Sequence, residues 1–377
     1  MKLWKVWSLF GAGTMAMTAM LAYQAGCSGG SSTADAGAQG LPPAPPTNPT
    51  AAPATTETFA IQQLLLGESD RTGAPSTTAW KAYGYNLDGL VTTKDSTDVC
   101  TLAQGAPKSN QADGNNGIDN AFGSVILPII ETAASLPTPS TTISQSIDSG
   151  SFTIQLQITG LDDTNAAQNS TGLTGQLFAS GAYGGTPAFD STTDWPVEPQ
   201  LLVDPTDITK GSQISFNQAY ITNGTFVSGD LSTGGITVTI SLVFQGVPLS
   251  LSVNHAVITF DHTDANDAAN GTIAGVIDTQ DLITGLKSVA GRISASLCGS
   301  AFDGIAAQIE QASDIIHDGS NKSGVACDGI SIGLGFVGKK VANPDKIASS
   351  DAAVPPDPCA TDGGSGTDSS TTDAAGE

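Results

Sequence analysis

The densest group of oxygen-bearing side chains lies in one short segment, which reads Asp113-Gly114-Asn115-Asn116-Gly117-Ile118-Asp119-Asn120. Carboxylate and amide oxygens on a glycine-turned loop are the ligands that a hard cation such as Ca²⁺ takes in proteins. The spacing departs from the helix–loop–helix calcium motif, because Gly117 stands where that motif has a ligand and Ser124 replaces its bidentate glutamate. The competing interpretation is a turn held by hydrogen bonds from Asp and Asn side chains to the backbone.

A second acidic turn, Asn86-Leu87-Asp88-Gly89, precedes this segment. Clustered carboxylates raise one another's pKa, and a bound cation relieves their repulsion. If these aspartates converge in the fold, one shared site is therefore expected instead of two. The sequence predicts a Ca²⁺ site with the ligands Asp88, Asp113, Asn115 and Asp119.

Residues suited to catalysis are scarce by comparison. The histidines, His255, His262 and His317, show no paired metal spacing, and the sequence contains no GxSxG or SxxK motif. A GxGxxG match at Gly333–Gly338 lies inside a strand-like alternation, so its glycines are expected to permit close backbone approach and not to bind a dinucleotide. Two carboxylates of the glycosidase type need no fixed spacing, so an extracytoplasmic, glycan-acting hydrolase using loop carboxylates stays as an alternative.

Five aromatic residues in loop-rich stretches offer flat rings on which sugars stack. They are Trp80, Tyr83, Tyr85, Tyr183 and Trp195. The competing interpretation is that these rings pack at the ends of the sheet.

The N-terminus indicates export. A basic head, Met1–Lys5, precedes an uncharged apolar run, Val6–Tyr23, and then the residues Gln24-Ala25-Gly26-Cys27. These are the regions of a secretory signal peptide. The small residues before the cysteine resemble the lipobox of bacterial lipoproteins, which implies cleavage before Cys27 and lipid on that cysteine. The sequence departs from that family at Gln24, where the family usually has Leu.

Two other interpretations of this N-terminus stay open, namely an ordinary signal peptide and an uncleaved anchor helix. In the resembling family, Asp after the lipidated cysteine retains the protein in the inner membrane. Ser28 therefore implies an outer-membrane lipoprotein on the periplasmic or cell-surface side. The segments Tyr83–Gly89 and Asp113–Gly123, with Cys100 between them, also resemble a block of uncharacterised secreted lipoproteins to which no activity is attached.

The remaining four cysteines form an even set, which predicts two disulfides in an oxidising compartment. Three pairings are open. We expect Cys298–Cys327 and Cys100–Cys359, because the first closes a short loop.

The charge balance limits the partners. The 377-residue chain carries 36 acidic and 13 basic residues, a net charge of −23, so its surface repels nucleic acid and anionic lipid. We expect contact with the membrane only through an N-terminal lipid, and a glycan or a protein as the ligand.

Hydrophobic alternation predicts a mainly β fold. Period-2 patterns cover Phe152–Thr159, Ile236–Phe244, Val247–Val257 and Ile330–Phe336. Helical spacing appears between the last strands, over 279–317. We expect a β-sandwich or jelly-roll-like domain with a C-terminal helical hairpin inserted before the last strand.

Composition sets the expected boundaries. They are a signal peptide at 1–26, a lipid anchor and flexible Pro/Ala/Thr linker at 27–56, a single β-rich domain at 57–359, and a disordered tail at 360–377. The sequence thus favours an exported lipoprotein that serves as a non-catalytic binding or structural module, stabilised by Ca²⁺ if the acidic loops converge.

Overall fold

A computed structural model describes residues 40–134, 138–244, 247–293, 297–349 and Cys359. These residues all belong to one compact unit, Ala36–Glu377. The predicted signal peptide, the predicted lipid anchor at Cys27 and the predicted tail at 360–377 lie outside the described residues. No helix in the described part of the chain is long and apolar enough to cross a membrane.

The fold is an antiparallel β-barrel. Each strand alternates apolar and polar residues or carries small residues on one face. One face is therefore buried in the core, and the other packs against helices and loops or contacts solvent. The strands are β1 (Thr56–Leu65), β2 (Thr153–Thr159), β3 (Ser170–Ser180), β4 (Ile214–Thr222), β5 (Thr225–Val227), β6 (Ile236–Phe244), β7 (Val247–Asp264), β8 (Asp267–Asp278) and β9 (Gly329–Val341).

The long strand β7 closes the barrel. The sheet order is β5-β4-β3-β2-β1-β9-β8-β7-β6, and β5 also pairs with β7. One edge of β7 pairs with β6 as far as Ala256 and then with β5 from Thr259 to Asp261. Eight strands therefore form a closed ring, and β6 extends beside it. The expected β-sandwich or jelly-roll is wrong, because those folds keep two separate sheets and this chain joins its strands into one closed sheet.

Aromatic rings fill the barrel. Phe226 stacks on Phe260 with 4.7 Å between ring centroids, and Phe59 lies 5.6 Å from Phe260. All three rings are fully buried. The interior is a packed core, as in small barrels whose inward side chains meet at the axis.

Charged groups lie just beyond these rings, at the end of the barrel where β1 begins. The Lys340 ammonium pairs with Glu57 and lies 2.6 Å from a carboxylate oxygen of Asp163. His262, 2% exposed, packs edge-on against Phe59 and places Nε2 3.3 Å from Asp163. One ammonium lies between two carboxylates in this barrel-end ion cluster.

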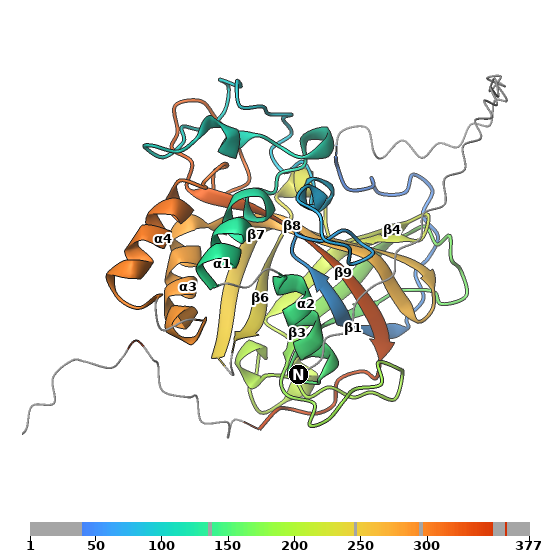
Figure 1. Cartoon of the computed structure of the whole chain (residues 1–377). Helices are drawn as coiled ribbons and strands as arrows, with labels where there is room; N and C mark the ends of the chain where they lie inside the picture. Colours follow the sequence, from blue (N-terminus) through green and yellow to red (C-terminus); the bar gives the residue numbers. More distant parts are fainter. Residues whose placement is uncertain (1–39, 135–137, 245–246, 294–296, 350–358, 360–377) are drawn as a thin grey trace, which may run out of the picture. The chain divides into compact units, whose positions relative to one another are not determined.

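Four α-helices cover the barrel. They are α1 (Leu127–Ala134), α2 (Pro139–Asp148), α3 (Thr279–Ile293) and α4 (Ser300–Glu310). Helices α1, α3 and α4 lie together on one side, and apolar residues of all three meet there (Figure 1). Helix α2 packs on β1, where Ser140 Oγ accepts a hydrogen bond from Leu66 N at 2.7 Å.

The region predicted as a helical hairpin is shorter than expected. Two helices do lie between β8 and β9, but the second ends at Glu310. Turns then lead from residue 311 to β9, and these turns carry Asp314 and Cys327. The predicted helix over the following residues fails because Asp314 takes backbone partners in β9 instead of continuing the helix.

The described part of the predicted linker lies against the barrel. Tyr220 Oη donates to the Pro43 carbonyl at 2.6 Å, Thr50 N donates to Asn169 O at 2.7 Å, and Asn86 N donates to Gly40 O at 2.8 Å. From residue 40 onward the chain therefore differs from the flexible linker that its composition predicts.

Candidate functional site

Two disulfides join the four described cysteines. Cys100 pairs with Cys327, and Cys298 pairs with Cys359. The prediction of two disulfides is confirmed, but the expected pairing Cys298–Cys327 and Cys100–Cys359 is wrong. Loop length alone favoured that pairing, whereas the backbone around Thr101 pairs in parallel with Ala326 and so places Cys100 beside Cys327.

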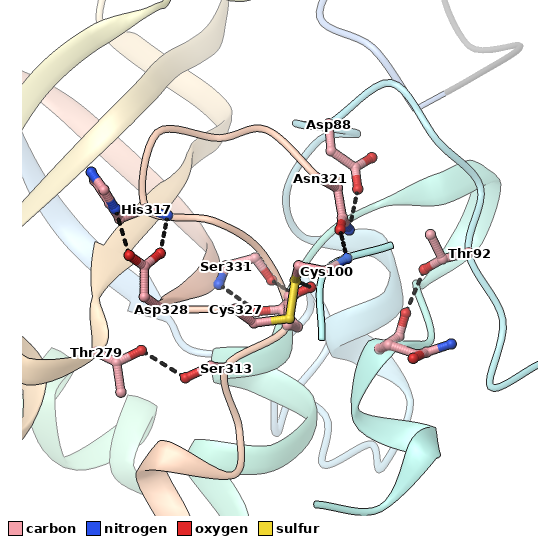
Figure 2. Close-up of a disulfide and its surroundings, with 12 residues drawn as sticks. Asp88, Thr92, Cys100, Thr279, Ser313, His317, Asn321, Cys327, Asp328 and Ser331 are labelled. Carbon is pink, nitrogen blue, oxygen red and sulfur yellow. Dashed lines mark hydrogen bonds and ion pairs between the residues drawn. A yellow bond between two sulfur atoms is a disulfide. The ribbon is translucent and has the colours of Figure 1, made fainter. Parts of the chain in front are cut away.

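Asn321 connects the first disulfide to the predicted cation ligands. Its side-chain oxygen accepts a hydrogen bond from Cys100 N at 2.5 Å, and its Nδ2 donates to Asp88 Oδ2 at 2.9 Å (Figure 2). Figure 2 also shows His317 on the opposite side of the disulfide, where its Nδ1 lies 2.9 Å from Asp328. The disulfide thus joins the loop that carries Asp88 to the turns that precede β9.

Three of the four predicted ligands converge. Asp88, Asp113 and Asp119 lie close enough for their charges to interact, and Asp314 joins them from the turn before β9. Asp119 and Asp314 are only 3% and 8% exposed. We call these four residues the acid cluster. Asn115 stays outside it, because its side chain is solvent-exposed at the start of a 3₁₀ turn.

Burial shifts the acid cluster toward its protonated state. Burial, with the Asp88 charge as a smaller cause, raises the pKa of Asp113 to about 6. Burial and the neighbouring carboxylates raise the pKa of Asp119 well above its ordinary value. Burial raises the pKa of Asp314 to about 7 despite hydrogen bonds from Ser331. Raised pKa values favour the protonated form of these carboxyls near neutral pH.

Backbone and hydroxyl donors occupy the carboxylate oxygens. Asp119 Oδ2 accepts from Leu87 N at 2.6 Å, and Asp113 accepts from both the amide and the hydroxyl of Thr92. Asp314 likewise accepts from the amide and the hydroxyl of Ser331 on β9. These bonds hold the loop residues to one another and the turn at Asp314 to the barrel, which agrees with the structural interpretation that the sequence left open.

The acid cluster does not fit a Ca²⁺ ion. Within the described ranges, no group of three or more His, Cys, Asp or Glu side chains is arranged to hold a metal. A calcium cage needs six to eight oxygens turned toward one point. Here the oxygens face separate backbone and hydroxyl donors. The expectation of a calcium site is therefore not supported.

Glycines of β9 let this loop approach the barrel. A Cβ on Gly333 would collide with the Tyr83 carbonyl, and one on Gly335 would lie 2.6 Å from the Tyr83 ring. The Asn120 side chain spans the contact: its Oδ1 accepts from Gly333 N and its Nδ2 donates to Gly333 O, both at 3.0 Å. The GxGxxG match thus serves close packing of backbone on backbone, as predicted.

The aromatic rings predicted to stack on sugars are mostly buried. Trp195 and Tyr83 are 0% and 1% exposed, and Tyr183 packs on Trp195 with centroids 5.2 Å apart. Tyr85 donates to or accepts from Thr259 Oγ1 at 2.8 Å. These contacts favour the packing interpretation.

A different surface is hollowed and polar. A cavity of about 420 Å³ lies on the outer face of β2, β3 and β4, with the loop over 203–212 as one wall. Strand register places Gln157, Gln176 and Ser215 side by side across the three strands. Thr159 and Thr174 form the next row with Asn217 close by on β4. The floor is therefore made of hydroxyls and amides.

A second cavity of about 350 Å³ lies on the other side of β4. Its far wall is formed by Asp230, Thr233 and Thr237. Both cavities are lined by Ser215, Phe216 and Asn217. Ser215 and Asn217 are exposed, whereas the Phe216 ring belongs to the core. We call the two cavities and the exposed β4 residues between them the β4 groove.

Sequence reasoning missed this groove. The alternation over Phe152–Thr159 shows that Gln157 and Thr159 face away from the core, and this was the available signal. The side chains on β3 and β4 line up with those of β2 only through strand register. The wall is formed by the loop over 203–212, whose sequence shows no regular pattern. Asp314 was missed for a similar reason, because it lies far from the other aspartates in sequence.

The chain matches no protein-family model, no curated protein and no solved structure.

Proposed function

We propose that this chain is an exported, lipid-tethered protein whose barrel serves as a non-catalytic binding module. The observation that carries the proposal is the cysteine pairing. The four described cysteines pair with one another, so none of them is left to bond Cys27 within the chain. Disulfides form and persist outside the cytosol, and a leftover cysteine after a signal-like segment suits lipidation.

The surface supports binding instead of catalysis. Each of the three cavities described has at most one carboxylate: the apolar cavity between α1, α3 and α4 has none, and the β4 groove has Asp230. Glycoside hydrolysis needs two facing carboxyls. In the acid cluster, Asp119 and Asp314 are buried and already hydrogen-bonded. The hydrolase alternative therefore has no observation in its favour among the described residues.

Lipidation is tested by expressing the full-length chain in a bacterium with an outer membrane and measuring the mass of its mature N-terminus. We expect cleavage before Cys27 and acyl groups on Cys27. The variant Cys27→Ser should lose the acyl groups and accumulate as precursor. The matched variant Ser28→Asp should keep the acyl groups and move from the outer to the inner membrane fraction.

An unmodified Cys27, or a mature N-terminus at another residue, would contradict the tether. A Gln24→Leu variant sharpens the result, because it restores the apolar residue of the lipobox. If processing is slow in the native chain, this variant should accelerate cleavage at the same bond. Acceleration at a different bond would identify an ordinary signal peptide.

A further inference from the structure

We infer that the β4 groove binds a neutral oligosaccharide chain laid across β4. This inference rests on the proposed binding function and assigns it a site and a ligand class. In this groove, hydrogen-bonding side chains gather around two cavities without a cluster of charges. Asn217 offers an amide, and Ser215 and Thr174 offer hydroxyls. Gln176 uses its Oε1 for Ser212 N and Gln157 uses its Nε2 for Thr58, so each offers the other half of its amide.

The charges around the groove favour an uncharged ligand. Lys210 lines one cavity and Asp230 the other, so the groove as a whole has no net charge. The chain's net charge of −23 repels polyanions before they reach it. Groups that both donate and accept hydrogen bonds match sugar hydroxyls, which do the same. Val203, 59% exposed on the wall, adds apolar surface for the C–H face of a sugar ring.

The first cavity lies on the face of the sheet and presents side chains. Peptides that add to sheets do so at an unpaired strand edge, where main-chain groups are available. Strands β2 and β3 are paired on both sides, whereas β4 pairs with β5 only over Tyr220–Thr222. A peptide could therefore add only along the edge of β4 beside the second cavity, and a neutral peptide probe tests this. In the first cavity, recognition must come from side-chain hydrogen bonds to the ligand.

The shape favours a chain over a single sugar. Neighbouring strands lie about 4.8 Å apart, so the rows across β2, β3 and β4 span roughly 10 Å before the second cavity begins. Ser215 and Asn217 line both cavities, so a ligand that fills one cavity reaches the other over these residues. We expect affinity to rise with the number of sugar units until both cavities are filled.

The test titrates the purified full-length protein with defined neutral oligosaccharides from one to six units, drawn from glucose, mannose and N-acetylglucosamine series. Calorimetry measures the affinity, and backbone amide shifts in NMR locate the site. We expect binding that strengthens at least 10-fold from monosaccharide to tetrasaccharide in one of these series. The shifts should cluster on Ser215, Asn217 and their neighbours. A neutral Ser/Gln peptide and a polyuronate serve as competing probes.

The variants are Ser215→Ala with Asn217→Ala, and the blocking change Thr174→Trp. Both should weaken binding of the best oligosaccharide at least 10-fold while the melting temperature stays near that of the native chain. Thr171→Ala, also exposed on β3 but outside the cavities, is the matched control and should bind normally.

The possible results distinguish a failure of this inference from a failure of the proposed function, a lipid-tethered binding module. Binding of the peptide instead of any sugar in the groove would overturn the ligand class, and sugar binding on another face would overturn the site. No binding of any tested series by a folded chain would overturn the inference, while lipidation of Cys27 would still support the tether. Hydrolysis of the bound sugar would support the site and contradict a non-catalytic module.

Discussion

Two clusters of carboxylates lie in the described part of this protein, one partly exposed at the end of the barrel and one centred on the buried Asp119 and Asp314, and they are compensated in different ways. In the barrel-end ion cluster, Lys340 lies between Glu57 and Asp163. Burial alone would lower the pKa of Lys340, but hydrogen bonds to the two carboxylates raise it. In the acid cluster, four aspartates meet, and backbone amides, hydroxyls and bound protons hold them in place.

The two kinds of compensation correspond to the different segments that each cluster joins. The barrel-end cluster joins β1 and β9, which already share a ladder, to the loop after β2. The acid cluster joins an irregular loop to the turns before β9, with the Cys100–Cys327 disulfide beside it. Where paired strands fix the geometry, one opposite charge is sufficient to hold the carboxylates in place. Where the loop has no strand pairing, the disulfide and protonated carboxyls hold it instead.

Removing the disulfide should have the largest effect. In the chain-entropy model, a loop closed over a sequence separation of 227 stabilises the fold by about 5 kcal/mol. We expect Cys100→Ser with Cys327→Ser to lower the melting temperature by roughly 10 °C or more. Cys298→Ser with Cys359→Ser is the control, with a separation of 61 and a smaller expected loss. Equal losses would show that loop length does not decide the effect.

Removing the one cation of the barrel-end cluster should have the next largest effect. Lys340→Met leaves Glu57 and Asp163 facing each other without a partner, which should cost on the order of 2–3 kcal/mol in urea unfolding. The control Lys339→Met breaks the more exposed pair with Asp267 and should cost less than about 1 kcal/mol. If both variants lose the same stability, the lower exposure of the barrel-end cluster does not increase its contribution to stability.

The acid cluster should make stability fall as pH rises. An acid whose pKa is raised by folding holds its proton in the folded state while the unfolded chain has lost it. The stability that this proton contributes therefore declines as the pH rises from the pKa in the unfolded chain, near 4, to the pKa in the folded chain, which is about 7 for Asp314. Asp314→Asn keeps an acceptor for Ser331 N and cannot ionise. We expect the free energy of unfolding of this variant, relative to that of the native chain, to rise by on the order of 2 kcal/mol as the pH increases from 5 to 8.

The control for this pH effect is Asp95→Asn, which removes the same charge from an exposed side chain. Its difference from the native chain should stay nearly constant over the same pH range. Urea unfolding at pH 5, 6.5 and 8 measures both variants. A constant difference for Asp314→Asn as well would show that its burial does not govern its ionisation.

The two clusters also differ in how far sequence predicts them. The sequence indicates Asp88, Asp113 and Asp119 as ligands of one site if they converge, because the turn residues around them are dense and local. It does not indicate Asp314, because a turn after a helix brings that residue to the cluster. No pattern singles out Glu57, Asp163 and Lys340, which meet only when β1, β9 and the β2–β3 loop are assembled.

The same limit applies to the fold. Alternation predicted strands within Phe152–Thr159 and Ile236–Phe244, but alternation is identical in sandwiches and barrels. Closure depends on Thr225–Val227, a strand of three residues that pairs with β7 and has no sequence signature. The disulfide pairing failed likewise, because it depends on which turns the closed sheet brings together.

Calcium should have the smallest effect, and it tests the acid cluster most directly. A cation bound by Asp88, Asp113 and Asp119 would displace the donors Leu87 N and Thr92 N, at a cost in buried hydrogen bonds. We therefore expect the melting temperature at pH 8 to differ by less than about 1 °C between millimolar Ca²⁺ and chelator. A rise of several degrees that Asp119→Asn abolishes would show that the carboxylates reorganise around a metal. In that case the acid cluster would be compensated by an opposite charge, as the barrel-end cluster is.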